Sequence, residues 1–432
     1  MAAWILIILL GLVTAAVPVA AVLGILTFSL DELYMNGRLT PAIGEFVWDK
    51  SKEFILVAVP LFILLGEIML RAGIGRRMYN AVIQWLSWLP GGLMHANIGS
   101  CTIFAASSGS SVATAATVGT VAYPEIKKRH YNERLFLGSL AAGGTLGILV
   151  PPSINLIIYG LITDTSVPEL YLAGILPGIA LSILFMGTII IACLMRPSWG
   201  GDKVETSWAE RIRVLPDLLP PMILFAAVVG SIYAGIATPT EAASIGVVIS
   251  LVIAAFFKAL NVRMLIEAFE GTMRTTAMIM LIIFAAVFLN LVLGFMGVTQ
   301  TIIAYIDELG LTPVETILVI VLFYLILGMF METLSMMLTT VPIVFPIVKA
   351  MGVAEFSDVW FGILITILME AALITPPIGV NLYVVHGIRT DGGKFNDVAY
   401  GAVPFVAAML CMIGILIVYP QVAIWLPNMV YR

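Results

Sequence analysis

Two adjacent prolines interrupt an apolar segment near residue 150, and this interruption limits what the chain can fold into. The stretch from Leu149 to Gly160 reads LVPPSINLIIYG, and its flanks are apolar enough to cross a membrane. Pro151 and Pro152 supply no N–H and clash with the preceding turn, so a helix through this segment must break. Inside a bilayer an unwound backbone survives only against protein or a polar cavity. We therefore expect a buried gap here.

A second copy of this pattern lies in the other half of the chain. From Ile374 the sequence reads ITPPIGVNLYVVHG, so Pro376 and Pro377 repeat the proline pair and Asn381 corresponds to Asn155. Other landmarks keep a similar offset, such as Pro90 with Pro313, Pro124 with Pro346 and Gly174 with Gly401. The pattern indicates a diverged tandem duplication. Broken hydrophobic segments at matching places in two halves are the sequence signal of a secondary transporter's binding site.

The composition is that of a polytopic membrane protein. Hydrophobic residues make up 61% and charged residues 11% of the chain, whereas about 25% of a soluble domain is charged. The three cysteines and three histidines are scattered and have no metal-ligand spacing. No phosphate-binding GxxxxGK[ST] loop, Ser/His/Asp pattern or zinc pattern occurs. We therefore expect neither an enzyme nor a cofactor.

Apolar runs long enough to span about 30 Å predict nine membrane helices: Ala2 to Phe28, Phe54 to Leu70, Leu135 to Ile162, Leu170 to Met195, Leu218 to Ile236, Glu241 to Phe257, Thr275 to Met296, Val359 to Gly387 and Val398 to Leu426. Two further regions, about 93–126 and 315–348, are too long for one crossing and have small or polar residues at their centres. We predict each to be a re-entrant hairpin.

The distribution of basic residues predicts the orientation. With a cytoplasmic N-terminus, sixteen of the 21 Lys and Arg residues fall in cytoplasmic connections, and the C-terminus is periplasmic. The first repeat, residues 1–195, then begins inside the cell, and the second, residues 241–432, begins outside. Residues 196–240 form a cytoplasmic loop and a linking helix. The predicted fold is thus an all-α inverted-topology repeat with two hairpins and two proline-broken helices, at about 135–162 and 359–387.

The predicted core contains no base to pair with an anionic substrate. Half-helix N-termini carry partial positive charge and unpaired N–H groups, so they can hold an anion instead. Hydroxyls and carbonyls around Ser107, Ser108, Gly109, Ser110 and Ser111 are hard oxygen ligands that suit a cation such as sodium. Small residues also let membrane helices pack closely, and that structural explanation stays open for each serine taken singly.

Three acids lie inside apolar runs and are candidate functional residues. We expect Glu67 to pair with Arg71, one helical turn later. Glu332, in the second hairpin, and Glu370, before the second break, keep proton coupling open as an alternative to sodium.

Several motifs together resemble the large membrane subunit of tripartite ATP-independent periplasmic (TRAP) transporters, within the wider ion-transporter superfamily. These motifs are SSGSSVATAATVGTVAYPEIKKRHY, PPSINLIIYG, TPTEAA and TPPIGVNLYV. The resemblance implies a sodium-coupled elevator that works with a small four-helix membrane subunit and a periplasmic substrate-binding protein in the bacterial inner membrane. It implies one sodium site at Ser107 to Ser111 with Pro152, Ser153 and Asn155, and another at Thr333, Thr375, Pro376, Pro377 and Asn381.

The substrate implied by the resemblance is an organic acid lying between these two sites. We expect it to contact Ser110, Ser111, Thr114, Asn155, Glu332 and Asn381. Family substrates include C4-dicarboxylates and sialic acid, with a slight preference here for sialic acid. Because the chain starts at the large-subunit pattern, we expect the small subunit to be a separate chain. A self-sufficient sodium- or proton-coupled carboxylate carrier and a passive channel remain as alternatives.

If the protein is an elevator, the hairpins and breaks should move against a fixed frame. We expect that frame to contain the first and last helices of each repeat and the linking helix Leu218 to Ile236.

Overall fold

The computed structural model describes residues 11, 12, 15, 17–204 and 206–431, with side-chain detail for all of these except Asp307. This described part is helical, and it contains no β-strand. Seven of its helices are long and apolar enough to cross a membrane, and the bent pair α9 (Glu133–Leu149) and α10 (Ile154–Thr163) makes an eighth candidate. The predicted class, an all-α polytopic membrane protein, is confirmed.

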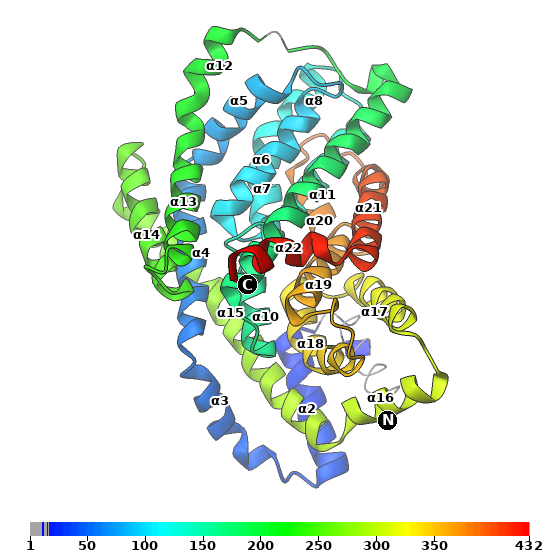
Figure 1. The fold of residues 1–432 in the computed structure, drawn as a ribbon. Coiled ribbons are helices and arrows are strands. Elements are labelled where there is room, and N and C mark those ends of the chain that lie inside the picture. The colour runs from blue at the N-terminus through cyan, green and yellow to red at the C-terminus, as the bar shows by residue number, and fades with distance from the viewer. Residues whose placement is uncertain (1–10, 13–14, 16, 205, 432) are drawn as a thin grey trace.

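Both predicted hairpins and both predicted breaks form. The first hairpin consists of α6 (Leu93–Ser108) and α7 (Ser111–Ala122), and the second of α17 (Pro313–Gly328) and α18 (Thr333–Ala350). The second broken helix consists of α19 (Asp358–Leu373) and α20 (Val380–Ile388). Figure 1 shows the first hairpin in the upper half of the molecule and the second in the lower half. The two hairpins therefore approach the middle from opposite ends.

The proline pairs end their helices as expected. The peptide bonds Pro151–Pro152 and Pro376–Pro377 are both cis. After the first pair, Ser153 is extended and its hydroxyl accepts the N–H of Leu156, which starts α10. After the second pair, Gly379 adopts φ 52° and precedes α20. Each break thus creates a new helix N-terminus inside the protein.

The remaining helices surround these four elements. They are α2 (Val19–Met35), α3 (Ile43–Ser51), α4 (Ala58–Arg71), α5 (Ile74–Leu86), α8 (Pro124–Lys128), α11 (Val167–Met195), α12 (Trp208–Val214), α13 (Leu219–Tyr233), α14 (Pro239–Phe256), α15 (Val262–Phe295), α16 (Val298–Leu309), α21 (Phe395–Val418) and α22 (Gln421–Tyr431).

The first and the last predicted helices differ from the observed ones. Most of the span from Ala2 to Phe28 lies at residues outside the described part, and the described helix α2 starts after Pro18 and continues to Met35. The span from Val398 to Leu426 is two helices, because the chain leaves α21 at Tyr419 and Pro420 precedes α22. A proline cannot donate the backbone hydrogen bond that would continue the first helix.

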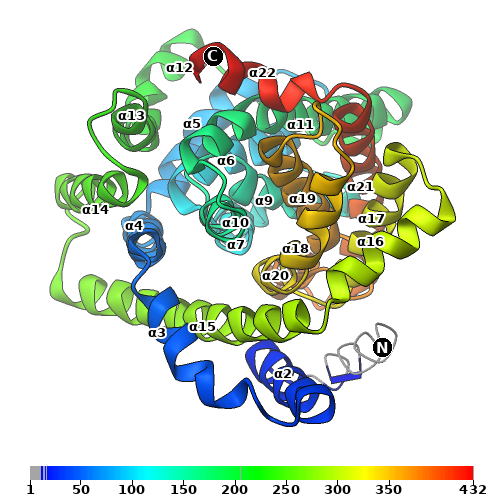
Figure 2. The same cartoon turned by 60° about the horizontal axis from the view of Figure 1, so that its bottom comes forward.

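The helices divide into two packed groups (Figure 2). Helices α2, α3 and α4 pack against α15, and α14 packs against α4 and α13. In the other group, α9 packs against α6, α7, α11 and α21, while α19 packs against α17, α18 and α21. The two halves of this second group interlock, since α10 lies on α18 and α20 lies on α7.

Two amphipathic helices connect the groups. Helix α5 joins α4 to the first hairpin, and α16 joins α15 to the second hairpin. Glycines in the left-handed region flank both connectors: Gly73 (φ 71°) and Gly91 (φ 109°) around α5, and Gly297 (φ 65°) and Gly310 (φ 64°) around α16. L-residues with a side chain rarely adopt this backbone conformation, so glycine is the residue that fits these positions.

Connections that carry basic residues meet at one end of the bundle. Arg134 pairs with Asp397 (Nε to Oδ1, 3.0 Å), the backbone N–H of Asp202 donates to the carbonyl of Arg129 (2.8 Å), and Arg77 lies 4.6 Å from the ring centroid of Phe257. All of these connections are on the side that the sequence predicts to be cytoplasmic. We call the end formed by residues 71–77, 127–134, 196–202 and 389–397 the basic end.

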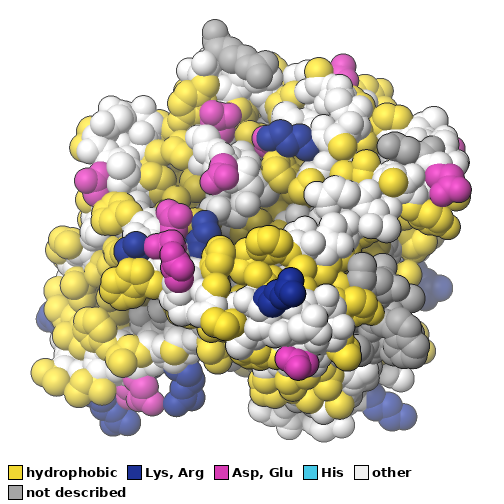
Figure 3. All heavy atoms as spheres, turned by 90° about the horizontal axis from the view of Figure 1, so that it is seen from below, with side chains coloured by type: hydrophobic (Ala, Val, Ile, Leu, Met, Phe, Trp, Pro, Cys, Tyr) yellow, Lys and Arg dark blue, Asp and Glu magenta, His cyan; other side chains and the backbone are white. Residues whose placement is uncertain are grey.

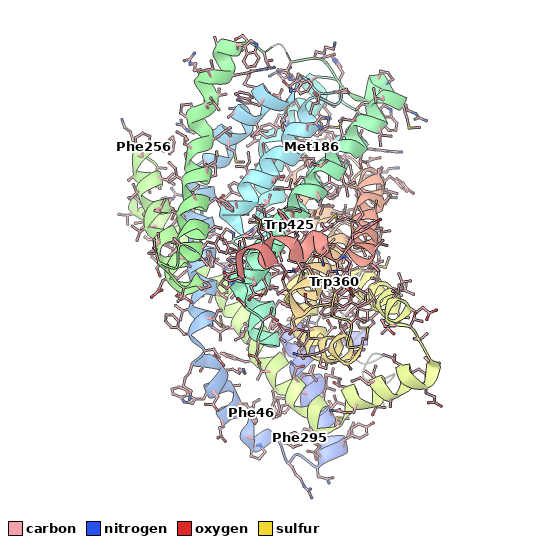
Figure 4. All side chains as sticks on the ribbon, in the orientation of Figure 1. Phe46, Met186, Phe256, Phe295, Trp360 and Trp425 are labelled. Carbon is pink, nitrogen blue, oxygen red and sulfur yellow. The ribbon has the colours of Figure 1, made fainter. Side chains whose placement is uncertain are left out.

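The surface is largely apolar, as a bilayer requires. Seen from the end opposite the α5 and α12 end, charged side chains are scattered among hydrophobic ones (Figure 3). Phe256 and Phe295, at the ends of α14 and α15, are 80% and 65% exposed and sit at the periphery (Figure 4). Trp360 is buried and donates its indole N–H to the carbonyl of Leu416 at 2.9 Å.

Candidate functional site

The two hairpin tips and the first break meet at a cavity of about 390 Å³. From the sequence-predicted set, it is lined by Ser108, Gly109, Ser110, Ser111, Asn155, Glu332 and Thr333. Helices α4 and α15 close it from the other group, through residues such as Gly66, Glu67, Thr275 and Met278. The cavity therefore lies where the two packed groups face each other.

The first hairpin tip is held by close backbone contacts. Gly109 adopts φ 58° and ends α6, and the Ser110 hydroxyl caps α7 by accepting the N–H of Ala113 at 3.3 Å. A Cβ on Gly66 of α4 would lie 3.0 Å from the carbonyl oxygen of Ser108, and one on Gly147 of α9 would lie 2.6 Å from that of Ser110. Glycine on both sides thus lets the tip fit between α4 and α9.

The hydroxyls of this tip have defined partners. Ser107 donates to the carbonyl of Phe104 (2.9 Å), and the hydroxyls of Ser108 and Thr114 lie 2.7 Å apart. Ser111 donates to Oε1 of Glu370 at 2.7 Å. Thr114 is fully buried and does not line the cavity. The Ser107 side chain is buried, and its hydroxyl bonds within its own helix.

The second hairpin tip is capped by a carboxylate. Glu332 accepts the backbone N–H of Ser335 at 3.2 Å and the hydroxyls of Ser335 and Thr333 at 3.3 and 3.1 Å. Negative charge is favourable at a helix N-terminus. Glu332 and Glu67 are the charged residues that line the cavity in the described part of the chain. Glu67 pairs with Arg71 as predicted, with 3.1 Å between Oε2 and Nη2. Arg71 also pairs with Glu267 of α15, at 2.9 Å.

The breaks differ in their surroundings. Pro151, Pro152 and Ser153 are all buried, and the hydroxyl of Tyr171 donates to the carbonyl of Ser153 at 3.4 Å. At the second break Pro377 is exposed. Thr375 donates to the carbonyl of Ala371 at 2.7 Å.

The second break reaches the cavity only through Leu373, the last residue of α19. Asn381 donates from Nδ2 to the carbonyl of Ala141 on α9 at 3.3 Å. Thr375, Pro376, Pro377 and Asn381 do not line the cavity. The structure therefore brings Ser108 to Ser111, Asn155 and Thr333 together at the cavity, whereas Ser107, Pro152 and Ser153 do not line it. Asn381 lies on α20, which packs beside α7 and α9.

Three buried polar atoms near these groups have no hydrogen-bond partner in the described part of the chain: Asn155 Nδ2, Asn381 Oδ1 and Glu370 Oε2. Buried polar atoms are normally paired, so each of these is a candidate contact for a ligand. An amide N–H suits a carboxylate, whereas an amide carbonyl suits a cation.

Glu370 is the residue whose place sequence reasoning missed. The sequence marked it as an acid within an apolar run, but no local pattern indicates that it reaches the first hairpin. Apart from Glu67, the lining residues of α4 and α15 were also missed, because they carry no motif and come to the cavity only through tertiary packing.

Comparison with known proteins supports the transporter interpretation. Residues 6–422 match the family model described as "Tripartite ATP-independent periplasmic transporter, DctM component". The C4-dicarboxylate TRAP transporter large permease protein DctM of Pseudomonas aeruginosa is 33% identical over 384 residues, covering 88% of each chain. The sialic acid TRAP transporter large permease protein SiaM of Vibrio cholerae is 30% identical over 378 residues, covering 87% of each chain.

Two further relatives extend this comparison. The ectoine/5-hydroxyectoine TRAP transporter large permease protein UehC of Ruegeria pomeroyi is 30% identical over 377 residues, covering 87% of this chain and 86% of that protein. The solved structure of the Alcanivorax borkumensis YdaH transporter has a similar fold, with a TM-score of 0.55 at 14% identity, covering 88% of this chain and 89% of that one. The chain thus belongs to the family of TRAP transporter large permeases, the DctM component, whose members are transporters and not enzymes.

Proposed function

We propose that this chain is the large membrane subunit of a binding-protein-dependent TRAP transporter, which carries an organic acid across the bacterial inner membrane with sodium as the coupling ion. The observation that carries this proposal is the cavity between both hairpin tips, the first break and helices α4 and α15. It combines hydroxyls, an unpartnered amide nitrogen and half-helix N-termini. The N-terminus would be cytoplasmic and the C-terminus periplasmic.

The substrate's carboxylate would lie at the N-terminus of α7. Ser110, Ser111 and Asn155 line the cavity there, and a helix N-terminus attracts an anion through its N–H groups and its dipole. The lining contains no Lys or Arg in the described part of the chain. Two carboxylates, Glu67 and Glu332, therefore make co-bound cations favourable when an anion enters.

Sodium would occupy the two oxygen-rich groups. One is the first tip with the first break, at Ser107, Ser108, Gly109, Ser110, Pro152, Ser153 and Asn155. The other is the second break with Thr333, at Thr375, Pro376, Pro377 and Asn381. The unpartnered Oδ1 of Asn381 supports the second assignment, because neutral oxygens are ligands that a hard cation accepts.

Transport would proceed by an elevator motion of one packed group against the other. The group built on α6, α7, α9, α10 and α17–α20 holds the candidate site, and the group of α2–α4 and α13–α15 forms the frame. Helices α11 and α21 pack against α9 and α19, so we now assign them to the moving group and not, as predicted, to the frame. The glycine-flanked connectors α5 and α16 would allow the relative displacement.

The proposed partners and the candidate substrates are those of related transporters. A small four-helix membrane subunit would dock on the frame, and a periplasmic binding protein would deliver the substrate. The relatives are named for C4-dicarboxylates, sialic acid and ectoines. Sialic acid, succinate and ectoine are therefore the probes to test first.

Reconstitution tests the proposal. The chain and the small subunit are placed in liposomes, and uptake of each radiolabelled probe is measured with and without the binding protein, under a sodium gradient or a proton gradient. We expect uptake only with the binding protein and a sodium gradient. Uptake without any binding protein would show a self-sufficient carrier, and uptake driven by protons alone would show proton coupling. Accumulation of the probe that never exceeds its equilibrium concentration would show a channel.

A further inference from the structure

A second pocket, of about 650 Å³, lies at the basic end between α9, α11 and α21. Its lining includes Asn132 and Arg134 from the start of α9, Arg196 and Trp199 after the end of α11, and Tyr400 from the second turn of α21. We call it the α9–α11–α21 pocket. It shares no lining residue with the candidate transport site.

The acids in this pocket already have basic partners. Glu133 and Asp397 both contact Arg389, whose side chain is 2% exposed, and Asp397 also pairs with Arg134 at 3.0 Å. Arg389 further pairs with Asp391, which lies 3.6 Å from Lys127.

Arg196 has no such acidic partner. Its guanidinium makes no ion pair with the described residues and lies 4.9 Å from the ring centroid of Trp199. The charged side chains that line the pocket are two bases, Arg134 and Arg196, and two acids, Glu133 and Asp397. Because Arg389 and Arg134 already pair with both acids, Arg196 is the lining base without an acidic partner in the described part of the chain.

An aromatic ring lies beside each of the two arginines that line the pocket. The guanidinium of Arg134 lies 5.7 Å from the ring centroid of Tyr400, and that of Arg196 lies 4.9 Å from the ring centroid of Trp199. A guanidinium stacked on a ring keeps its N–H groups free at the edge, where they can bind a phosphate. Tyr and Trp also concentrate at the headgroup level of bilayers.

The surface next to the pocket is apolar and faces outward. On the last turns of α11, Ile191, Leu194 and Met195 are 60%, 66% and 78% exposed, and Val403 on α21 is 54% exposed. Helices α11 and α21 pack against each other. A ligand that places a negative group in the pocket would therefore extend along hydrocarbon-compatible side chains, as an acyl chain does.

We propose that the α9–α11–α21 pocket binds the headgroup phosphate of an anionic phospholipid, with Arg134 and Arg196 as the phosphate ligands. The lipid phosphate would supply the acidic partner that Arg196 lacks, and the lipid chains would cover α11 and α21. Basic pockets between membrane helices on the cytoplasmic side are known to suit anionic lipid headgroups. A free phosphate shares the headgroup chemistry but would not use the apolar surface.

Lipid binding to the purified full-length chain tests this proposal. Bound lipid is counted by native mass spectrometry after titration with phosphatidylglycerol, phosphatidylcholine or inorganic phosphate. We expect saturable binding of phosphatidylglycerol and much weaker binding of the other two. Arg196→Gln should weaken phosphatidylglycerol binding about fivefold, the effect of one interfacial base, and Arg196→Lys should retain most of it.

Arg213→Gln is the matched control, because Arg213 is an exposed arginine of α12 without an ion pair in the described residues. It should leave binding unchanged. Thermal unfolding of each variant without added lipid separates a folding defect from a binding defect. If Arg213→Gln and Arg196→Gln weakened phosphatidylglycerol binding equally, the lipid would be bound by general surface charge and not by the pocket. If inorganic phosphate bound as tightly as phosphatidylglycerol, the ligand would be a free anion and not a lipid.

Discussion

The hydroxyl of Ser111 on the first hairpin donates to the carboxylate of Glu370 on the second broken helix, across 2.7 Å and 259 positions of sequence. This hydrogen bond joins the two halves of the chain directly behind the cavity. The other oxygen of Glu370 has no partner in the described residues, and the side chain is buried. The tip of one hairpin is thus oriented by the other half of the protein.

The first prediction concerns this hydrogen bond. Glu370→Gln keeps an oxygen that accepts the Ser111 proton, so sodium-driven uptake should stay within about threefold of the wild type. Glu370→Ala leaves the buried hydroxyl unpaired, which costs about 1–3 kcal/mol, and should reduce uptake more strongly. Initial uptake rates in proteoliposomes provide the measurement. Proton-driven uptake that Glu370→Gln abolishes would instead identify Glu370 as the coupling site.

The second prediction concerns sodium. Ser110→Ala, Asn155→Ala and Asn381→Ala should each raise the half-saturating sodium concentration for uptake at least about threefold, because each removes an oxygen near a proposed site. Ser110 also caps α7, and loss of a cap costs about 1 kcal/mol. Ser166→Ala is the matched control, since Ser166 caps α11 outside the cavity (3.5 Å to the N–H of Glu169). An equal sodium effect in Ser166→Ala would mean that helix stability, and not ion binding, is being measured.

The third prediction concerns topology. Lys128 and Glu355 are exposed and lie on connections predicted to face opposite sides of the membrane. Cysteines placed there should react with an impermeant maleimide from the cytoplasmic and the periplasmic side, respectively. The native Cys411 is exposed, whereas Cys101 and Cys193 are buried, so the background should carry Cys411→Ser. Labelling of both positions from one side would contradict the inverted arrangement.

The fourth prediction concerns pH. The Arg389 guanidinium hydrogen-bonds Asp391 and holds the pKa of that carboxyl well below its usual range. A carboxyl whose folded pKa is lowered stabilises the protein above its unfolded pKa of about 3.9, and this stability is lost as the pH falls. Arg389→Gln removes the shared base of three partly exposed acids and should cost about 1.5–3 kcal/mol, the range for hydrogen bonds to charged groups. The difference in unfolding temperature from the wild type should be constant between about pH 5 and 8 and shrink below about pH 4.

Arg263→Gln is the control for this pH experiment. Arg263 pairs with Glu267 at 3.0 Å, but its side chain is 89% exposed. An exposed pair contributes at most about 1 kcal/mol, so the unfolding temperature should change little. If Arg263→Gln lowered the unfolding temperature as much as Arg389→Gln does, burial of the Arg389 side chain would not be the reason that its ion pairs stabilise the protein.

The sequence predicted those elements that depend on local chemistry. Pro151 with Pro152 and Pro376 with Pro377 interrupt the middle of apolar segments, where the missing N–H groups stop the preceding helix, so both breaks appear at the expected residues. The start of α15 was predicted at Thr275, but the helix begins at Val262. Charged side chains excluded this first part from a hydropathy count, yet Arg263–Glu267 and Arg274–Glu270 pair at i,i+4 spacing along the helix, which supports helix formation.

The site could be predicted only in part. The serine tip and Asn155 lie on a hairpin and at a helix break, and local residues in the sequence mark both of these elements. Their place in the site could therefore be predicted. The separation of Asn381 from the cavity, and the approach of Glu370 to Ser111, depend on how α19 and α20 pack on the first half of the chain. Such packing leaves no periodic pattern in the sequence.

The fifth prediction concerns the connectors. A Cβ on Gly73 would meet no atom within 4 Å, so Gly73→Ala acts through its left-handed backbone alone, at a cost of about 1–2 kcal/mol. Turnover should fall while the apparent substrate affinity stays unchanged. Gly230, within α13, also has open space around its Cβ position, and Gly230→Ala should leave turnover unaffected. Unchanged turnover in Gly73→Ala would show that the bend lies elsewhere.

The paired glycines around α5 and α16 confine bending to a few peptide units. Both connecting helices could therefore keep their internal hydrogen bonds through a transport stroke, and no segment of the chain would have to melt. The resistance to this movement would then come from the lipid that the moving group of helices displaces. We expect the turnover rate of such a machine to follow the thickness and fluidity of the bilayer closely, and to respond weakly to mild denaturants that fray helices.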